Sequence, residues 1–205
     1  MTICPDPATT TVDHRCAGLL LVRLGGSPAA TSPSASNVAL EQAGAGDPDG
    51  LERAAARLEA MLAVRRLVLE DDGVPEPDRS LSRLAAEACA GQRPWIAALP
   101  MDVGRPLADG GTWAQALGAW RQPVVLVIPA VQLGTGLPAA GTALLRQWQV
   151  PLVGLLQWGG LWQPGPRQAD GLSWLGMLPE GPAAAEADPS LSLALRLRLG
   201  DLLRS

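Results

Sequence analysis

The stretch RQPVVLVIPAVQLGTGLPAAGTALLRQWQVPLVGLLQW, residues 121–158, decides the fold. Residues 123–130 and 150–156 are continuous apolar runs rich in β-branched side chains, the pattern of parallel strands that are buried on both faces. Between them, apolar residues recur at helical spacing over residues 138–148. Two such strands joined by a helix form a right-handed βαβ unit. The sequence therefore predicts an α/β fold with a mainly parallel sheet and helices on both faces.

The remaining segments fit the same architecture. Residues 1–16 are polar and predict a flexible N-terminal arm, while residues 17–205 predict a single α/β domain. Residues 159–171 predict a long loop. We expect further strands at residues 17–24, 66–71, 95–99 and 174–178, and further helices at residues 49–65, 78–91, 112–120 and 188–205.

Composition excludes several classes of function. A net charge of −4 argues against a nucleic-acid partner, and all 16 basic residues are arginine, which excludes any chemistry that needs a lysine. No run reaches the ~18–20 apolar residues of a membrane span, so we expect no membrane partner. Cys4, Cys16, Cys89 and the single His14 lack zinc-site spacing. We expect a cytoplasmic protein with reduced thiols.

Acidic residues end the second predicted strand. Asp71 and Asp72 follow it directly, and the carboxyl ends of parallel strands are where ligands and Mg²⁺ bind in open α/β sheets. Asp71 is therefore a candidate catalytic residue, and Asp71 and Asp72 are candidate metal ligands. The alternative is a solvated acidic turn that binds nothing.

The loop after the first predicted strand, residues 25–37, is rich in small residues. Such a loop is where an α/β sheet would cradle a phosphate. The P-loop pattern GxxxxGK[ST] needs a second glycine and a lysine at fixed spacing, and neither is present here. A plain linker is the alternative interpretation.

Residues 94–181 carry short motifs in an order that resembles dethiobiotin synthetase, the P-loop enzyme of biotin synthesis. The matching segments are Arg105-Pro106-Leu107, residues 123–127, Leu133-Gly134-Thr135, residues 150–156 with Gly159, and residues 175–179. The resemblance implies a P-loop NTPase-like fold and an ATP-dependent cyclo-ligase that uses Mg²⁺ to join CO2 to diaminopelargonic acid.

The resemblance also assigns roles to individual positions. It implies that substrate is contacted by Leu133, Gly134 and Thr135. It also implies that the adenine of the nucleotide is held by Trp158, Pro179 and Glu180. The acidic motif of the family corresponds either to Asp71 and Asp72 or, in a tighter register, to residues 100–104.

The departures from the family are informative. Its P-loop lysine and glycines have no counterpart, the Asn-His pair is Leu137-Pro138, and the adenine-recognising asparagine is Trp158. We therefore expect a dethiobiotin synthetase-like protein of weak or no activity, with ATP and Mg²⁺ if active and no cofactor otherwise. The alternatives are a non-catalytic scaffold or partner subunit, and an unrelated α/β domain.

The family's dimers suggest a homodimer or pairing with a related subunit. Tryptophan is enriched at interfaces, so we expect Trp148, Trp158 or Trp162 near the contact.

Overall fold

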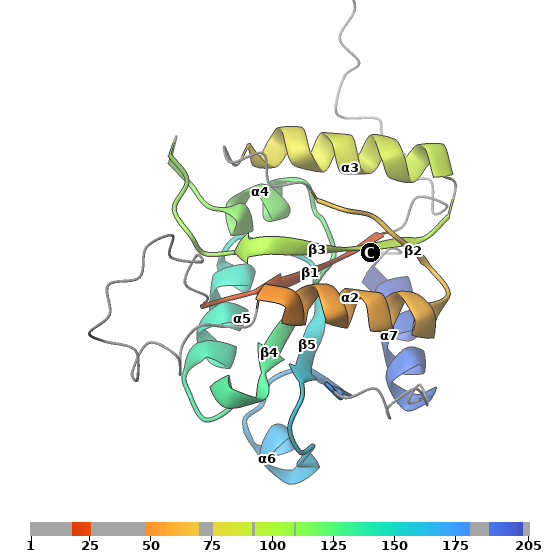
Figure 1. Ribbon diagram of the computed structural model, residues 1–205. Helices are drawn as coiled ribbons and strands as arrows, with labels where there is room; N and C mark the ends of the chain where they lie inside the picture. Colours follow the sequence, from red (N-terminus) through yellow and green to blue (C-terminus); the bar gives the residue numbers. More distant parts are fainter. Residues whose placement is uncertain are drawn as a thin grey trace, which may run out of the picture.

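A computed structural model of the chain shows one six-stranded sheet in which every pairing is parallel (Figure 1). The order is β2-β3-β1-β4-β5-β6. The structure describes residues 18–25, 48–69, 76–91, 93–108, 110–180 and 189–202. The strands are β1 (Gly18–Arg23), β2 (Arg65–Arg66), β3 (Trp95–Asp102), β4 (Val124–Pro129), β5 (Leu152–Trp158) and β6 (Trp174–Leu178).

Helices cover both faces of this sheet. Two of them pack on one face, α2 (Pro48–Leu62) and α7 (Pro189–Leu202). On the other face lie α3 (Pro77–Gly91), α4 (Trp113–Ala119) and α5 (Leu137–Gln147). The 3₁₀ turn η3 (Ala130–Gln132) follows β4, and α6 (Pro164–Ala169) joins β5 to β6. The predicted α/β fold is confirmed, and the all-parallel sheet is consistent with a P-loop NTPase-like architecture.

The sheet is central because its strands are apolar on both faces. In β1, Leu19 and Leu21 belong to the core under α2 and α7, while Leu20 and Val22 belong to the opposite core. All four are almost fully buried. Burying one such side chain contributes ~1.5–3 kcal/mol relative to exposure, so the continuous apolar runs place these strands in the interior.

The connections diverge between β1 and β4, which are neighbours in the sheet. From β1 the chain crosses one face through α2, and from β4 it crosses the other face through α5. A divergence of this kind opens a crevice outside the carboxyl ends of the two strands, the usual ligand position in open α/β sheets.

Two predicted segments differ from the structure. The second strand pairs only at Arg65–Arg66, although the Leu67 N–H also donates to the Ile96 carbonyl at 2.8 Å. The strand predicted at residues 66–71 is therefore wrong over residues 67–69, and its residues 70 and 71 lie outside the described residues. Leu67 and Leu69 are buried while Val68 is 66% exposed, so the apolar alternation reflects packing without pairing. Residues 159–171 were predicted as a loop, but Pro164 starts the helix α6, since proline fits a first helical turn.

Other predictions are confirmed or lie outside the described residues. The helix predicted at residues 188–205 is α7 over its described part, and the helix predicted at residues 112–120 is α4, which Thr112 caps by accepting from the Gln115 N–H. The arm at residues 1–16, the loop beyond Gly25, and the acids Asp71 and Asp72 lie outside the described residues. Within the described ranges no helix has the length and apolar character that crossing a bilayer requires.

Two helical glycines give a matched test of packing. A Cβ at Gly118 in α4 would collide with the backbone carbonyl of Trp148, whereas a Cβ at Gly165 in α6 would meet nothing within 4 Å. Alanine normally stabilises a helix relative to glycine by up to ~1 kcal/mol. We expect Gly118→Ala to lower the free energy of unfolding by about 1–3 kcal/mol because the backbone cannot give way cheaply. Gly165→Ala should leave it unchanged or slightly higher in urea denaturation.

Candidate functional site

The carboxylate of Asp102 lies at the carboxyl end of β3, beside the end of β1. Its Oδ2 accepts a hydrogen bond from the Gly25 N–H at 2.6 Å, and its Oδ1 accepts one from the Gly104 N–H at 2.7 Å. Hydrogen bonds to an ionised carboxylate are short and strong. Asp102 is half-buried, so these two bonds hold the exit of β1 against the exit of β3.

The local sequence explains this arrangement. Gly25 has φ +77°, a left-handed conformation that glycine adopts without a Cβ penalty, and a Cβ there would come within 3.3 Å of Leu137. Arg23 is the register partner of Asp102, and its Nη2 donates to the Pro100 carbonyl at 3.1 Å. The two strand ends are therefore tied by side chains as well as by the ladder.

Gln132 approaches the same point from η3. Its Nε2 donates to the Gly25 carbonyl at 3.4 Å, and the side chain is only 7% exposed. Its Oε1 is buried and finds no hydrogen-bond partner within the described part of the chain. Gly25 is thus held by Asp102 through its N–H and by Gln132 through its carbonyl.

The predicted substrate residues lie at the start of α5. Thr135 is exposed, but its hydroxyl donates to the Gln132 carbonyl at 2.8 Å and accepts from the Leu137 N–H at 3.2 Å. Gly134 is exposed, with open space where a Cβ would stand, and Leu133 packs partly against the core. The Thr135 hydroxyl therefore shapes the turn that leads into α5.

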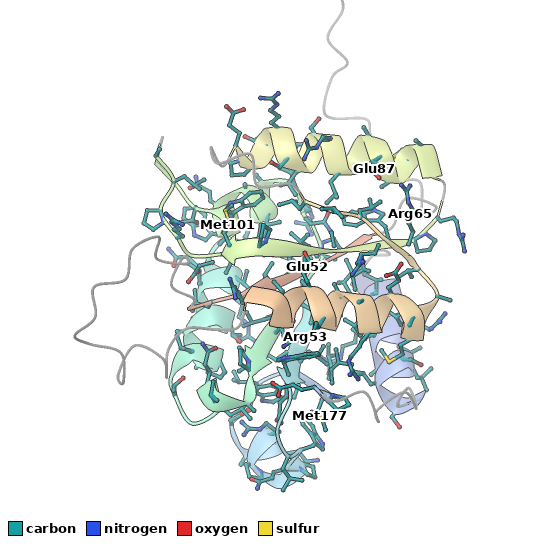
Figure 2. The ribbon with its side chains drawn as sticks, viewed as in Figure 1. Glu52, Arg53, Arg65, Glu87, Met101 and Met177 are labelled. Atoms are coloured by element: carbon teal, nitrogen blue, oxygen red, sulfur yellow. The ribbon has the colours of Figure 1, made fainter. Side chains whose placement is uncertain are left out.

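Trp158 ends β5 and is buried, with 3% of its surface exposed. The guanidinium groups of Arg53 and Arg57, one turn apart on α2, each lie 5.8 Å from the centre of its rings. Figure 2 shows Arg53 below α2, on the side where Met177 of β6 lies. In this conformation the indole offers no exposed face on which a base could stack.

The other two predicted nucleotide residues lie close to Trp158. The Glu180 carboxylate occupies the space that a Cβ at Gly159 would need, and Gly159 has φ +72°. The Glu180 carbonyl accepts from Arg57 Nη2 at 3.3 Å, and the Gly159 N–H donates to Leu178 at 2.8 Å. The ends of β5 and β6 are therefore closed by packing between protein groups.

The structure thus brings the predicted residues together in two groups. Thr135 and its neighbours lie beside the hydrogen bonds from Gly25 and Gly104 to Asp102, which we call the Asp102 clamp. Trp158, Pro179 and Glu180 lie at the ends of β5 and β6. Asp102 belongs to the tighter register of the acidic motif, and Gln132 was not predicted at all. The sequence shows Gln132 only as a single amide after a buried strand, and such a residue is typical of an ordinary loop.

Another amide was also missed. Gln157 is fully buried in β5, where its Nε2 donates to the carbonyls of Gly159 at 2.8 Å and Leu161 at 3.2 Å. These bonds fold the chain back as it leaves the strand, so Gln157 has a structural role.

ATP and Mg²⁺ are the cofactors that the resemblance implies, and the residues that the structure describes do not fit them. A phosphate cradle uses free backbone N–H groups and a lysine, whereas the Gly25 N–H is taken by Asp102 and the chain has no lysine. Mg²⁺ needs oxygen ligands in octahedral geometry. Within the described ranges no group of three or more His, Cys, Asp or Glu residues gathers to hold a metal.

Comparison with known proteins adds no family assignment, since no protein-family model and no curated protein matches the chain.

Replacing Asp102 tests the clamp. Asn keeps the size of the side chain but turns one acceptor into a donor that faces a backbone N–H. A hydrogen bond to a charged group contributes ~1.5–3 kcal/mol, so we expect Asp102→Asn to lower the free energy of unfolding by about 2–3 kcal/mol. The control is Glu52→Gln on the exposed side of α2 (Figure 2), which should change it by less than ~0.5 kcal/mol. A loss of similar size in both variants would contradict the clamp.

Proposed function

We propose that the protein is a dethiobiotin synthetase-like member of biotin biosynthesis that has weak or no ATP-dependent ligase activity. The main support for the loss of activity is the pair of hydrogen bonds that the Gly25 and Gly104 N–H groups donate to Asp102. At the root of the loop after β1, the protein uses its own carboxylate to satisfy an N–H that a P-loop would offer to phosphate.

Charge supports the same conclusion. Transfer of a phosphoryl group depends on fixed cations and N–H donors that stabilise the charge on its oxygens. At this crevice the described side chains that reach Gly25 are a carboxylate and an amide whose remaining atom is an acceptor. The carboxylate repels a phosphate, and the P-loop lysine that would offset this charge has no counterpart in the sequence.

The residues at the expected adenine position support the same conclusion. Trp158 stands where the resemblance implies an adenine, but two arginines cover its ring and Glu180 packs on Gly159. Admitting a base would require these groups to move, and their displacement would cost part of the ~1–3 kcal/mol that stacking contributes.

A second candidate is a non-catalytic scaffold or a partner subunit, in a homodimer or with a related chain. The same hydrogen bonds to Asp102 favour it, because they use the Gly25 and Gly104 N–H groups for contacts within the protein. We place this function in the cytoplasm, since Cys89 is an exposed free thiol that suits a reducing compartment.

The purified protein should form no dethiobiotin from diaminopelargonic acid, Mg-ATP and carbon-labelled bicarbonate. The physical reason is the missing charge stabilisation at the phosphates. The measurement is incorporation of label into product, with an active dethiobiotin synthetase as positive control. Labelled product at a rate comparable with the control, abolished by Asp102→Asn in a folded variant, would contradict the loss of activity.

A further inference from the structure

The segment between β5 and β6, residues 161–171, is weakly attached to the rest of the molecule. Figure 1 shows its helix α6 at the bottom of the view, away from α2 and α3. No residue of α6 is buried, and in the whole segment only Trp162 and Arg167 are half-buried. A segment with so few buried contacts can open at a low cost in free energy while the rest of the fold stays intact.

The backbone of this segment bonds only to itself. The Arg167 N–H donates to the Gln163 carbonyl at 3.4 Å, and the Asp170 N–H donates to the Pro166 carbonyl at 3.2 Å. Within the described ranges no backbone hydrogen bond joins residues 161–171 to another helix or strand. Side chains must therefore hold the segment in place.

The indole of Trp174 in β6 is the main attachment point. It packs partly against the core that α3, α4 and α5 cover. The guanidinium of Arg167 lies 5.0 Å from the centre of its ring, and Trp162 contacts it edge to face with ring centroids 6.3 Å apart. Asp170 accepts a hydrogen bond from Trp174 Nε1 at 2.7 Å and lies 3.7 Å from Arg167 Nη1. Three side chains of the segment thus depend on one ring.

Glycines lie at both ends of the segment. Gly160 has φ +68° and Gly171 has φ +70°. A Cβ at Gly171 would meet nothing within 4 Å, so the chain has room to turn there. Hinges are a few loop positions, often small residues, that absorb a change in φ and ψ. The two glycines therefore suit the ends of a moving segment.

We propose that residues 161–170 form a flap, the α6 flap, that opens about Gly160 and Gly171 while the sheet and the other helices stay folded. The contacts of Trp162, Arg167 and Asp170 with Trp174 hold the flap closed. Because these contacts share one ring, they are lost together, and the flap moves as a unit.

Opening uncovers groups at the carboxyl end of β5. Gln157 is fully buried, and one of the two carbonyls that its Nε2 reaches is that of Leu161 in the flap. Its Oε1 has no hydrogen-bond partner among the residues that the structure describes. An open flap takes Leu161 away and presents this amide and the Trp174 ring at the edge where ligands bind in open α/β sheets. The α6 flap is therefore a lid over this part of the edge, and it does not depend on ligase activity.

Limited proteolysis with trypsin measures the opening, because the flap contains one cleavable bond, between Arg167 and Gln168. Cleavage follows the population of the open form when opening and closing are fast. We expect Trp174→Leu to raise the rate of cleavage at this bond at least tenfold. Arg146, which is exposed on α5, is the internal control. Its rate of cleavage should stay the same, because cleavage there requires α5 to unfold.

Trp120→Leu is the matched control variant. Trp120 Nε1 donates to Asp78 at 2.7 Å, as Trp174 Nε1 does to Asp170, but Trp120 lies outside the flap. This variant should leave cleavage after Arg167 unchanged. Equal increases after Arg146 and Arg167 in Trp174→Leu would show global unfolding and overturn the proposal, and so would no increase after Arg167.

Hydrogen exchange of the wild-type protein tests the flap without any substitution. We expect the amides of residues 161–171 to exchange through an opening that low concentrations of urea do not promote, because a local opening exposes little surface. The amides of β5 should exchange through an opening that urea does promote. The same dependence on urea in both segments would contradict an independent flap.

Discussion

The hydrogen bonds of the Asp102 carboxylate are the interaction on which the candidate site depends. The bond from Gly25 joins the end of β1 to the end of β3, and the bond from Gly104 fixes the turn that follows β3. β1 is also one of the two strands, β1 and β4, between which the chain connections diverge. The conformation of Gly25 follows from these hydrogen bonds, and through Gly25 so does the position of Gln132. The strand ends are therefore ordered by contacts within the protein, and the Gly25 N–H is already used in one of them.

The sequence predicted most of the fold because burial leaves a strong pattern. Runs such as residues 123–130 are apolar throughout, which is the pattern of a strand whose two faces are both buried. The second strand was misplaced because Leu67 and Leu69 are buried by packing, while pairing is decided by where β3 begins, at Trp95. Sequence periodicity reports burial and cannot report a ladder that stops after two residues.

The site was harder to predict than the fold. Asp102 is the last residue of the eight-residue strand β3, which includes Pro100. A proline in an apolar run indicates the end of a strand, which made the acids after residue 69 look like the better candidates. The resemblance placed Trp158 at an adenine site, and its local sequence does not indicate that Arg53 and Arg57 of α2 cover its ring, because these arginines are distant in sequence. Side chains that close a site from another element leave no local pattern, so their effect is visible only in three dimensions.

Our proposal is that side chains of the protein itself occupy the positions at which a dethiobiotin synthetase would hold its nucleotide. Isothermal titration calorimetry of Mg-ATP into the intact protein measures this most directly. We predict no binding heat at millimolar nucleotide, because the sequence has no lysine, the Gly25 N–H is bonded to Asp102, and the Trp158 ring is buried. Micromolar binding of ATP to the wild-type protein would contradict it.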